Sequence, residues 1–475
     1  MSEETSVLRH LEQDFDQAVA RYVEFLRIPS ISTDPAYAGE TRRAGQWLAD
    51  QLAGLGFSAT LHETPGHPVL IAHHPGPAHD SKRGSAPHLL YYGHYDVQPP
   101  EPLDLWEHPP FEPTIVQAEH GPRMVARGAV DDKGQVMTFL EAFRGWHKVH
   151  GTLPAEITVL IEGEEETGSP SLPDFLKSHR DRLAAAAVAI VTDTNSWDIE
   201  TPAITTSLRG LVYVEVTLKG PSRDLHSGMY GGAAINPLNA LTRVLGQLHD
   251  DRGQVQIPGF YDDVVETPKD QLASWKALGF DEARFLGGIG LKTPSGEGGR
   301  HVLERLWSRP TCDINGIWGG YTGAGAKTVI AAEASAKLSC RLVAAQDPER
   351  IVAGIRSFFE ARTPPDCRWS ISLFGQSPGI SVATDSPYIR AAKAGLKQIY
   401  GKETVLMGAG GSVPVVGWMQ DILGLESVMV GFGLEDDRIH SPNEKFELRC
   451  LKNGILSHAA ILARLAAIQT GKPAK

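Results

Sequence analysis

The sequence predicts an α/β protein that has a mostly parallel sheet with helices on both faces and an inserted α+β domain. Short apolar segments alternate with amphipathic helical stretches before residue 209, which is typical of a parallel sheet covered on both faces. From residue 209 apolar and polar residues alternate instead, as in half-exposed antiparallel strands. Helical patterning returns near residue 387. We therefore predict one domain built from residues 1–208 and 387–475, interrupted by a second domain over residues 209–386.

The first segment opens with helices and continues with strands. Apolar residues recur every three or four positions over residues 5–27, and Pro29 follows this predicted helix. A second helix is predicted over residues 41–57. The strands predicted next are PVLIAHH (68–74), HLLYYGHYDV (88–97), MVARGA (124–129), ITVLIEG (157–163) and VAIVTD (188–193). One long helix, GQVMTFLEAFRGWHKV (134–149), is predicted between the third and fourth of these strands.

The inserted segment and the C-terminal part follow different patterns. LVYVEVTLKG (211–220) and part of TVIAAEASAKLSCRLVAA (328–345) alternate like antiparallel strands, whereas residues 248–325 indicate mainly loops. A helix is predicted over residues 386–401 and a buried strand over residues 427–433. A long terminal helix is expected to begin near Leu451.

Composition and charge exclude several classes of protein. The chain has 475 residues and a formal net charge of −12, which argues against nucleic acid or an anionic membrane as the main partner. No apolar stretch is long enough to span a membrane, and the charged N-terminus lacks the apolar core of a secretory signal. The four cysteines are scattered, without a CxxC pair, as in a reduced cytoplasmic protein. We therefore expect a cytoplasmic location.

Acidic residues and histidines follow the predicted strands. They occur in GHYD (93–96), RGAVDDKG (127–134), EGEEETGS (162–169), VTDTN (191–195) and RIHSPNEKF (438–446). Because ligands gather at the carboxyl ends of strands in open parallel sheets, these residues are expected to converge there. Taken singly, the aspartates could cap helices or turns and the glutamates could form a solvated face.

So many carboxylates in one place repel each other unless a cation lies among them. Zinc suits a mixture of histidine, aspartate and glutamate, and manganese is a harder alternative. Two ions are a sensible number for this many carboxylates. Other motifs are weaker: GGYTGAGAKT (319–328) lacks the Gly-Lys-Thr step of a phosphate loop, and Ser412 lies outside a GxSxG frame.

The motifs together resemble a known family. YGHYDVQP, ARGAVDDKG, EGEEETGS, TDTN, RDLHSGMYGG and IHSPNEKF resemble the aminoacylase/carnosinase-type family of dinuclear zinc peptidases, and most of all its cytosolic dipeptidase branch. The resemblance extends over nearly the whole chain. It implies that residues 1–208 and 387–475 form a catalytic domain and that residues 209–386 form a lid and dimerisation domain.

The resemblance also implies a set of metal ligands and a base. Asp131 would bridge two divalent ions, Zn²⁺ or else Mn²⁺ or Co²⁺. One ion would be completed by His94 and Asp193, the other by Glu166 and His440. Asp96 would orient His94 and raise its basicity. Glu165 would be the general base, acting on the attacking water and then on the leaving amine.

Within the same glutamate run, Glu162 and Glu164 are expected to be structural or solvated. The family also places a cis peptide bond between the residues that correspond to Asp131 and Asp132. The strand is expected to end at the glutamate run, so that the following loop allows the neighbouring residues Glu165 and Glu166 both to turn toward the metals.

The inserted domain would contribute to substrate binding. His226 matches a histidine that reaches the active site of the partner in family dimers and stabilises the oxyanion; a turn-capping histidine is the alternative. Arg341 matches an arginine that binds the carboxylate of the substrate, and Thr328 and Ser412 match positions that bind the same end. One departure is that WSISLFGQ (369–376) lacks a substrate-binding histidine of the dipeptidase branch.

The resemblance therefore implies a homodimeric, dinuclear metallopeptidase that acts on small peptides. The expected substrates are dipeptides or short peptides with a free C-terminal carboxylate. The nearest alternative is an amidohydrolase of N-acyl amino acids, with the same metals and another acyl pocket. A catalytically silent peptide-binding dimer is the alternative from another class.

Overall fold

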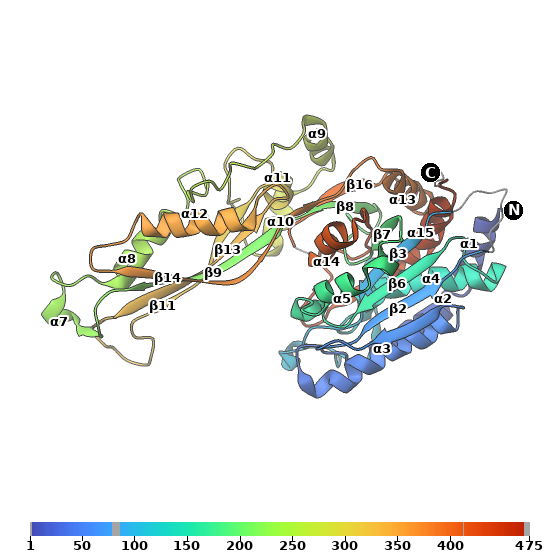
Figure 1. The fold of residues 1–475 in the computed structure, drawn as a ribbon, viewed down its shortest axis with the longest axis horizontal. Coiled ribbons are helices and arrows are strands. Elements are labelled where there is room, and N and C mark those ends of the chain that lie inside the picture. Colours follow the sequence, from blue (N-terminus) through green and yellow to red (C-terminus); the bar gives the residue numbers. More distant parts are fainter. Residues whose placement is uncertain (1, 78–85, 412, 470–475) are drawn as a thin grey trace. The chain divides into compact units, whose positions relative to one another are not determined.

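The computed structural model describes residues 2–77, 86–411 and 413–469. It divides into two compact units (Figure 1). Unit 1 comprises residues 1–206, 382–407 and 413–475, and unit 2 comprises residues 207–381 and 408–412. The described residues 408–411 thus group with unit 2, although they lie in the second predicted segment of the larger domain. Among the described residues, no helix combines the length and apolar character needed to cross a membrane.

Unit 1 is organised around a sheet whose central strands are parallel. The strand order is β1-β2-β6-β3-β7-β17-β8-β15, with β16 paired to β8. Strands β6, β3, β7 and β17 run parallel, whereas β2 and β8 are antiparallel to their neighbours. The bounds are β1 Ser58–His62, β2 Val69–His74, β3 Leu89–His94, β6 Ile157–Glu162, β7 Val188–Val191, β8 Ala203–Leu208, β15 Ile380–Ser381, β16 Val405–Ala409 and β17 Ser427–Met429.

The central strands are buried on both faces. On one face Tyr91 and Val159 belong to a core shared with helices α1 to α4, α13 and α15. The alternate residues Tyr92 and Leu160 are also fully buried, which requires cover on the other face. The predicted α/β architecture is therefore confirmed. The helices of unit 1 are α1 Glu3–Gln13, α2 Phe15–Leu26, α3 Ala38–Ala53, α4 Lys133–His150, α5 Leu172–Ser178, α6 Arg180–Leu183, α13 Pro387–Tyr400, α14 Pro414–Trp418 and α15 Leu448–Ala466.

The N-terminal helix differs from the prediction. The apolar spacing predicts one helix over residues 5–27, but the structure has α1 and α2, separated by Asp14. Asp14 has φ −90° and ψ 5°, outside the helical region, and its carboxylate pairs with Arg21 at 2.8 Å. Aspartate competes for local hydrogen bonds and so favours helix ends over helix interiors. Apolar spacing does not register such a break.

A small three-stranded sheet in unit 1 joins two distant parts of the sequence. Its order is β18-β5-β4, with bounds Lys445–Glu447, Gly121–Val125 and Thr114–Ala118. Strand β18 pairs antiparallel with β5, so that Lys445 lies opposite Val125. This pairing brings the loop that contains His440 next to the segment that leads to Asp131.

Unit 2 is built on a four-stranded antiparallel sheet of order β11-β13-β9-β14. Helices α8 and α12 lie against it (Figure 1) and share a core with it. A two-stranded ribbon, β10 with β12, accompanies this sheet. The bounds are β9 Gly210–Lys219, β10 Leu225–His226, β11 Thr311–Gly319, β12 Val329–Ile330, β13 Glu333–Leu342, β14 Arg368–Ser377, α7 Ser227–Tyr230, α8 Pro237–Leu245, α9 Lys269–Ala277, α10 Glu282–Gly288, α11 Val302–Trp307 and α12 Pro348–Glu360.

Strand β11 lies in the region for which the sequence indicates mainly loops. Most of its side chains are exposed or half-buried, and its register with β13 shifts between Ile314 and Gly316. A strand with an irregular register and few buried residues lacks the strict alternation on which the prediction depended. Its identity as a strand comes from pairing with β13.

Candidate metal centre

The residues predicted to bind metal lie where the parallel strands end. His94 is the last residue of β3, and Glu165 and Glu166 lie in a 3₁₀ turn after β6, Glu165–Thr167. Asp193 follows β7, which ends at Val191. Because β3, β6 and β7 are parallel neighbours, their carboxyl ends share one edge of the sheet, and the loops after them present these side chains together.

Asp131 lies between two histidines and belongs to two groups of possible ligands. Its Oδ1 is 3.1 Å from His94 Nε2, and its Oδ2 is 3.0 Å from His440 Nε2. One group is His94, Asp131 and Asp193, and the other is Asp131, Glu166 and His440. In each group one ligand atom per residue lies within 4.8 Å of the others. The structure thus brings the five predicted ligands together around one shared carboxylate.

Asp96 supports both sides of this cluster. Its Oδ1 lies 3.2 Å from His94 Nδ1, which orients the ring so that Nε2 faces Asp131. The same carboxylate accepts the backbone N–H groups of Glu165 and Glu166 at 3.2 Å and 3.0 Å. One fully buried side chain therefore positions a histidine and the turn that bears two glutamates.

Glu444 is a site residue that the sequence analysis missed. It is fully buried, and its two oxygens accept the backbone N–H groups of Gly128, Val130 and Asp131 at 2.9, 2.9 and 3.1 Å. Arg127 Nη1 donates to it at 2.8 Å. Since Glu444 lies four residues after His440, it links the loops of two ligands. The residues around it in HSPNEKF contain no pattern that predicts the burial of this carboxylate.

The loop that contains His440 is backbone-strained. Arg438, His440 and Asn443 all have positive φ, at 57°, 60° and 62°. Non-glycine residues in this region cost about 1–3 kcal/mol each and cluster at functional sites. The peptide bond between Asp131 and Asp132 is cis, as the resemblance implies. Asp132 accepts the backbone N–H of His94 at 3.0 Å.

The run of four glutamates separates into two pairs. Glu162 and Glu164 are buried and bond to the protein: Tyr92 Oη donates to Glu162 at 2.6 Å, and the His67 N–H donates to Glu164 at 3.0 Å. Both are therefore structural rather than solvated. Glu166 Oε2 lies 3.2 Å from His440 Nε2, and Gln98 Nε2 donates to the same oxygen at 2.7 Å.

The electrostatics of the cluster favour a bound cation. Burial, together with the nearby carboxylates of Asp193, Glu166 and Asp131 and against the opposing charge of His94, raises the pKa of Glu165 to about 9. Burial likewise raises the pKa of Asp193 to about 7, with Asp131 adding to the effect. Hydrogen bonds with Asp131 and Glu166 raise the pKa of His440 to about 10. Two imidazoles and three carboxylates form a donor set that fits divalent zinc, manganese or cobalt.

Unit 2 contains the other predicted site residues. His226 lies on β10 and Thr328 directly precedes β12; the two residues are close, since the Ser227 N–H donates to the Thr328 carbonyl at 3.0 Å. The His226 Nδ1 accepts the Gly228 N–H at 3.0 Å, so the ring does cap a turn. Arg341 is half-buried on β13. Ser412 lies outside the described residues.

Arg209 is a second arginine near Arg341 that the sequence analysis missed. Burial and the positive charge of Arg341 together lower the pKa of Arg209 to about 10, although Asp313 partly compensates. Two guanidinium groups close enough to repel each other form a site of positive potential that suits an anion. In the sequence the two arginines are 132 positions apart, and only the pairing of β9 with β13 brings Leu211 opposite Arg341.

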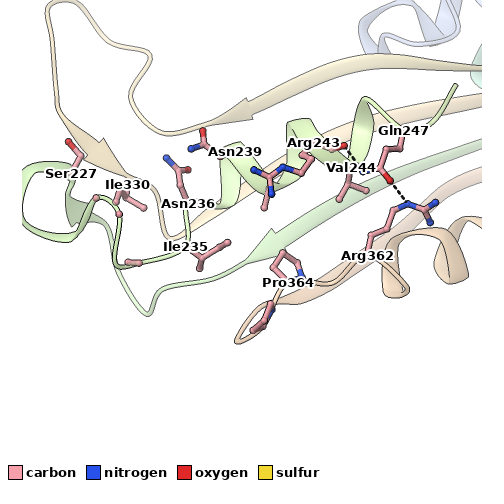
Figure 2. A pocket seen from close by; sticks show the side chains of 15 residues that line it. Ser227, Ile235, Asn236, Asn239, Arg243, Val244, Gln247, Ile330, Arg362 and Pro364 are labelled. Carbon is pink, nitrogen blue, oxygen red and sulfur yellow. Dashed lines mark hydrogen bonds between the residues drawn. The ribbon is translucent and has the colours of Figure 1, made fainter. Parts of the chain in front are cut away.

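A separate pocket in unit 2 has different chemistry. Its volume is about 680 Å³, and it lies along α8 (Figure 2). Asn236, Asn239 and Arg243 line it, together with Gln247 and Arg362, which bond to each other at 3.1 Å. None of the described residues that line it is acidic, a histidine or a cysteine. This pocket therefore offers no metal ligands and no general base.

Comparisons with known proteins relate the whole chain to peptidases. A family model described as peptidase family M20/M25/M40 matches residues 90–464. The Cys-Gly metallodipeptidase DUG1 of Saccharomyces cerevisiae is 29% identical over 96% of this chain and 97% of its own. The Beta-Ala-His dipeptidase of Homo sapiens is 28% identical over 97% of this chain and 92% of its own. The solved structure of the M20 family metallo-carboxypeptidase Sso-CP2 from Sulfolobus solfataricus has a TM-score of 0.81 and 30% identity, covering 95% of this chain and 99% of that one.

Proposed function

The chain belongs to peptidase family M20/M25/M40 and is a hydrolase of the metallopeptidase type, and we propose that it is a dinuclear metal-dependent dipeptidase. The observation that carries the proposal is the position of Asp131, whose two oxygens face His94 and His440 within two separate groups of ligands. A carboxylate shared in this way is what a pair of neighbouring cations requires.

We assign one ion to His94, Asp131 and Asp193, and the other to Asp131, Glu166 and His440. Zinc is the expected metal, with manganese or cobalt as alternatives. When bound, the ions supply Lewis-acid chemistry, which polarises the amide carbonyl and lowers the pKa of water at the site. Asp96 and Glu444 keep the ligands in place through the hydrogen bonds described above.

Glu165 is the proposed general base. Glu165 lies in the same turn as Glu166. Among the described residues, however, no ion pair or side-chain hydrogen bond involves the Glu165 carboxylate, so this carboxylate remains available for proton transfer. Two bound cations would offset the neighbouring carboxylates and lower the raised pKa of Glu165, so that its ionised form is available. In the proposed reaction this carboxylate accepts a proton from the attacking water and passes it to the leaving amine. Asp96 fixes its backbone and so aims the side chain.

The proposed substrates are dipeptides or short peptides with a free C-terminal carboxylate. Names of relatives support this class: one acts on Cys-Gly, one is a Beta-Ala-His dipeptidase, and one is a metallo-carboxypeptidase. Arg341 is proposed to bind the carboxylate, with Arg209 adding positive potential and Thr328 and Ser412 contributing hydroxyl groups. A fork of guanidinium donors suits bidentate binding of a carboxylate.

His226 is proposed to stabilise the oxyanion, and the protein is proposed to act as a homodimer in which His226 serves the partner subunit. Because its Nδ1 accepts a hydrogen bond from the Gly228 N–H, the neutral ring must have its proton on Nε2. The exposed ring therefore presents an N–H donor, which an oxyanion requires. A cytoplasmic location for this dimer stays a prediction.

The decisive experiment combines a substrate panel with one variant. Metal-loaded protein is assayed on free dipeptides, the same dipeptides amidated at the C-terminus, and N-acetyl amino acids. We expect hydrolysis of the free dipeptides only, and a loss of about 10²–10⁴-fold in kcat for Glu165→Gln with metal content unchanged. Full activity of Glu165→Gln would overturn the proposed mechanism, and preference for N-acetyl amino acids would make the protein a deacylase.

The dimer has a separate test. Subunits of Glu165→Gln are mixed with subunits of His226→Ala, and exchange is verified by differently tagged chains. If His226 acts in trans, the mixed dimer regains one intact site and therefore part of the activity. No recovery after verified exchange would contradict the role of His226 in the partner.

A further inference from the structure

A third group of possible metal ligands lies at the opposite ends of β3 and β6. His88 directly precedes β3, Glu156 directly precedes β6, and His73 is the fifth residue of β2. The parallel register pairs Leu89 with Ile157, so His88 and Glu156 lie side by side at the amino ends of β3 and β6. Six residues separate His88 from His94, which corresponds to about 20 Å along an extended strand. The group is therefore distinct from the candidate metal centre.

The three side chains converge on one point. Glu156 Oε1 lies 3.8 Å from His73 Nε2 and 3.7 Å from His88 Nδ1. One ligand atom from each residue lies within 4.8 Å of the other two. Ligand atoms around a tetrahedral zinc ion, each about 2.0–2.1 Å from the metal, lie about 3.3 Å apart. Small side-chain rotations therefore suffice to close this group on an ion.

Thr158 holds both imidazoles in the orientation that a metal needs. Its Oγ1 lies 3.1 Å from His73 Nδ1 and 2.8 Å from His88 Nε2, the nitrogens turned away from Glu156. A hydroxyl oxygen has two lone pairs and can accept an N–H from each ring. Both rings then present an unprotonated nitrogen toward Glu156. A hydrogen bond from the distal nitrogen to an oxygen is the usual support of a metal-bound histidine.

The surroundings suit binding and access. The side chain of Glu156 is 45% exposed and that of His73 is 32% exposed, whereas that of His88 is 10% exposed, so an ion can enter from solvent and still contact a buried ligand. Burial lowers the pKa of His88, although Glu156 and the Ala185 carbonyl act in the opposite direction. A neutral ring is the form that binds metal.

We propose that His73, His88 and Glu156 form a third metal site, which binds zinc or a similar transition metal with solvent in the remaining position. Two imidazoles and one carboxylate suit Zn²⁺, Co²⁺, Ni²⁺ and Cu²⁺ far better than Mg²⁺ or Ca²⁺. The ion connects β2 to the segments before β3 and β6. Its role is to hold these strand ends together, at a distance from the catalytic chemistry.

The test counts metal ions in the full chain. Wild type and His88→Gln are stripped with a chelator, dialysed against Zn²⁺ and analysed by elemental mass spectrometry. We expect His88→Gln to bind one zinc ion fewer than wild type, whatever number the other cluster holds, and to keep dipeptidase activity. His120→Gln, which removes an exposed histidine at a turn, is the matched control and should bind as many ions as wild type. Equal zinc content of wild type and His88→Gln would overturn the proposal.

A second measurement isolates the site and its support. In the Asp131→Asn background, Co²⁺ is titrated while its visible absorption is recorded, and the signal should disappear on adding His73→Gln. Thr158→Val should weaken Co²⁺ binding about 10–100-fold, with circular dichroism confirming that the variant is folded. An unchanged affinity in Thr158→Val would contradict the role of Thr158, and a signal that survives His73→Gln would contradict the site. Neither result depends on the proposed peptidase mechanism.

Discussion

Strand β3 has a histidine at each end, and the two histidines lie in very different surroundings. His94, at the carboxyl end, is fully buried and contacts Asp96 and Asp131. His88, just before the amino end, is close to a single half-exposed glutamate and a threonine hydroxyl. The acids raise the pKa of His94 well above its usual value against the effect of burial, whereas burial lowers that of His88.

The difference shows that the carboxyl ends of the parallel strands provide more supporting side chains for a metal site than the amino ends do. At that end the loops after several parallel strands converge, so buried side chains such as Asp96 and Glu444 can each hold two elements of the site. The amino end has fewer converging loops, and one hydroxyl group supports its cluster. We therefore expect tight, catalytically competent metal binding at the carboxyl end and weaker, structural binding at the amino end.

The largest expected effect follows from removing the shared carboxylate. Asp131→Asn withdraws one charge from both groups of ligands, so both ions should be lost at low metal concentration. Without several kcal/mol of Lewis-acid stabilisation, dipeptide hydrolysis should fall by at least about 10³-fold. Steady-state kinetics and metal analysis check this. An active variant that retains both ions would contradict the role of Asp131 as the carboxylate shared by the two ions.

Glu444→Gln should weaken the hydrogen bonds that hold the segment leading to Asp131, without replacing any of the predicted metal ligands. The amide can accept at one oxygen only, and its NH₂ group would face a backbone N–H of the segment that ends at Asp131. Zinc affinity at the candidate metal centre should fall about 10–100-fold. Competition titration with a zinc-binding dye measures this effect.

A purely structural role for Glu444 would give a different result. Thermal unfolding would then shift, since Arg127 loses its buried partner, while zinc affinity would stay the same. Glu435→Gln, in the same loop but exposed, is the matched control, for which we expect neither change.

A third histidine, His458, extends the comparison, because it is buried and has no acidic side chain beside it. His458 on α15 packs against Tyr91, Phe139 and Phe432, and neither ring nitrogen has a hydrogen-bond partner among the described residues. Burial lowers its pKa to about 3. With a depressed folded-state pKa, the stability that this group contributes is complete above about pH 6.5 and is lost as the pH falls toward 3.

His458→Leu should remove this pH dependence. Relative to wild type, the variant should gain about 2 kcal/mol in the free energy of unfolding between pH 7 and pH 5. Urea unfolding at the two pH values measures the difference. A difference between variant and wild type that does not change with pH would show that His458 is accessible to protons in the folded state.

The smallest expected effect is on catalysis when the amino-end cluster is removed. His88→Gln should change kcat/KM by less than about 2-fold, because His88 lies away from the candidate metal centre, before the opposite end of β3. Measuring kcat/KM of His88→Gln and of Asp131→Asn on the same dipeptide compares the effects of changing the amino end and the carboxyl end of β3. A large loss of activity in His88→Gln would mean that the two ends of β3 are coupled.

Much of the site could be predicted because its residues follow strands in a regular order. The resemblance based on YGHYDVQP, EGEEETGS and the other motifs is confirmed by the family match over residues 90–464. Residues such as Glu444 and Arg209 were missed because their importance lies in contacts with residues more than 100 positions away: Glu444 bonds to the Val130 N–H, 314 positions away. Local patterns contain no information on which exposed-looking charge becomes buried.

The sequence by itself determined the alternation of strands and helices, the positions of the chemical groups at strand ends and the membership of the family. These depend on side-chain periodicity and on local order, which any folded form of the chain must respect. Only the tertiary structure decided that Asp131 faces two histidines, that Glu444 joins the segment before Asp131 to the loop of His440, and that His73, His88 and Glu156 meet at the far edge of the sheet. Strand register and burial decide such contacts, because both depend on residues that are distant in the sequence.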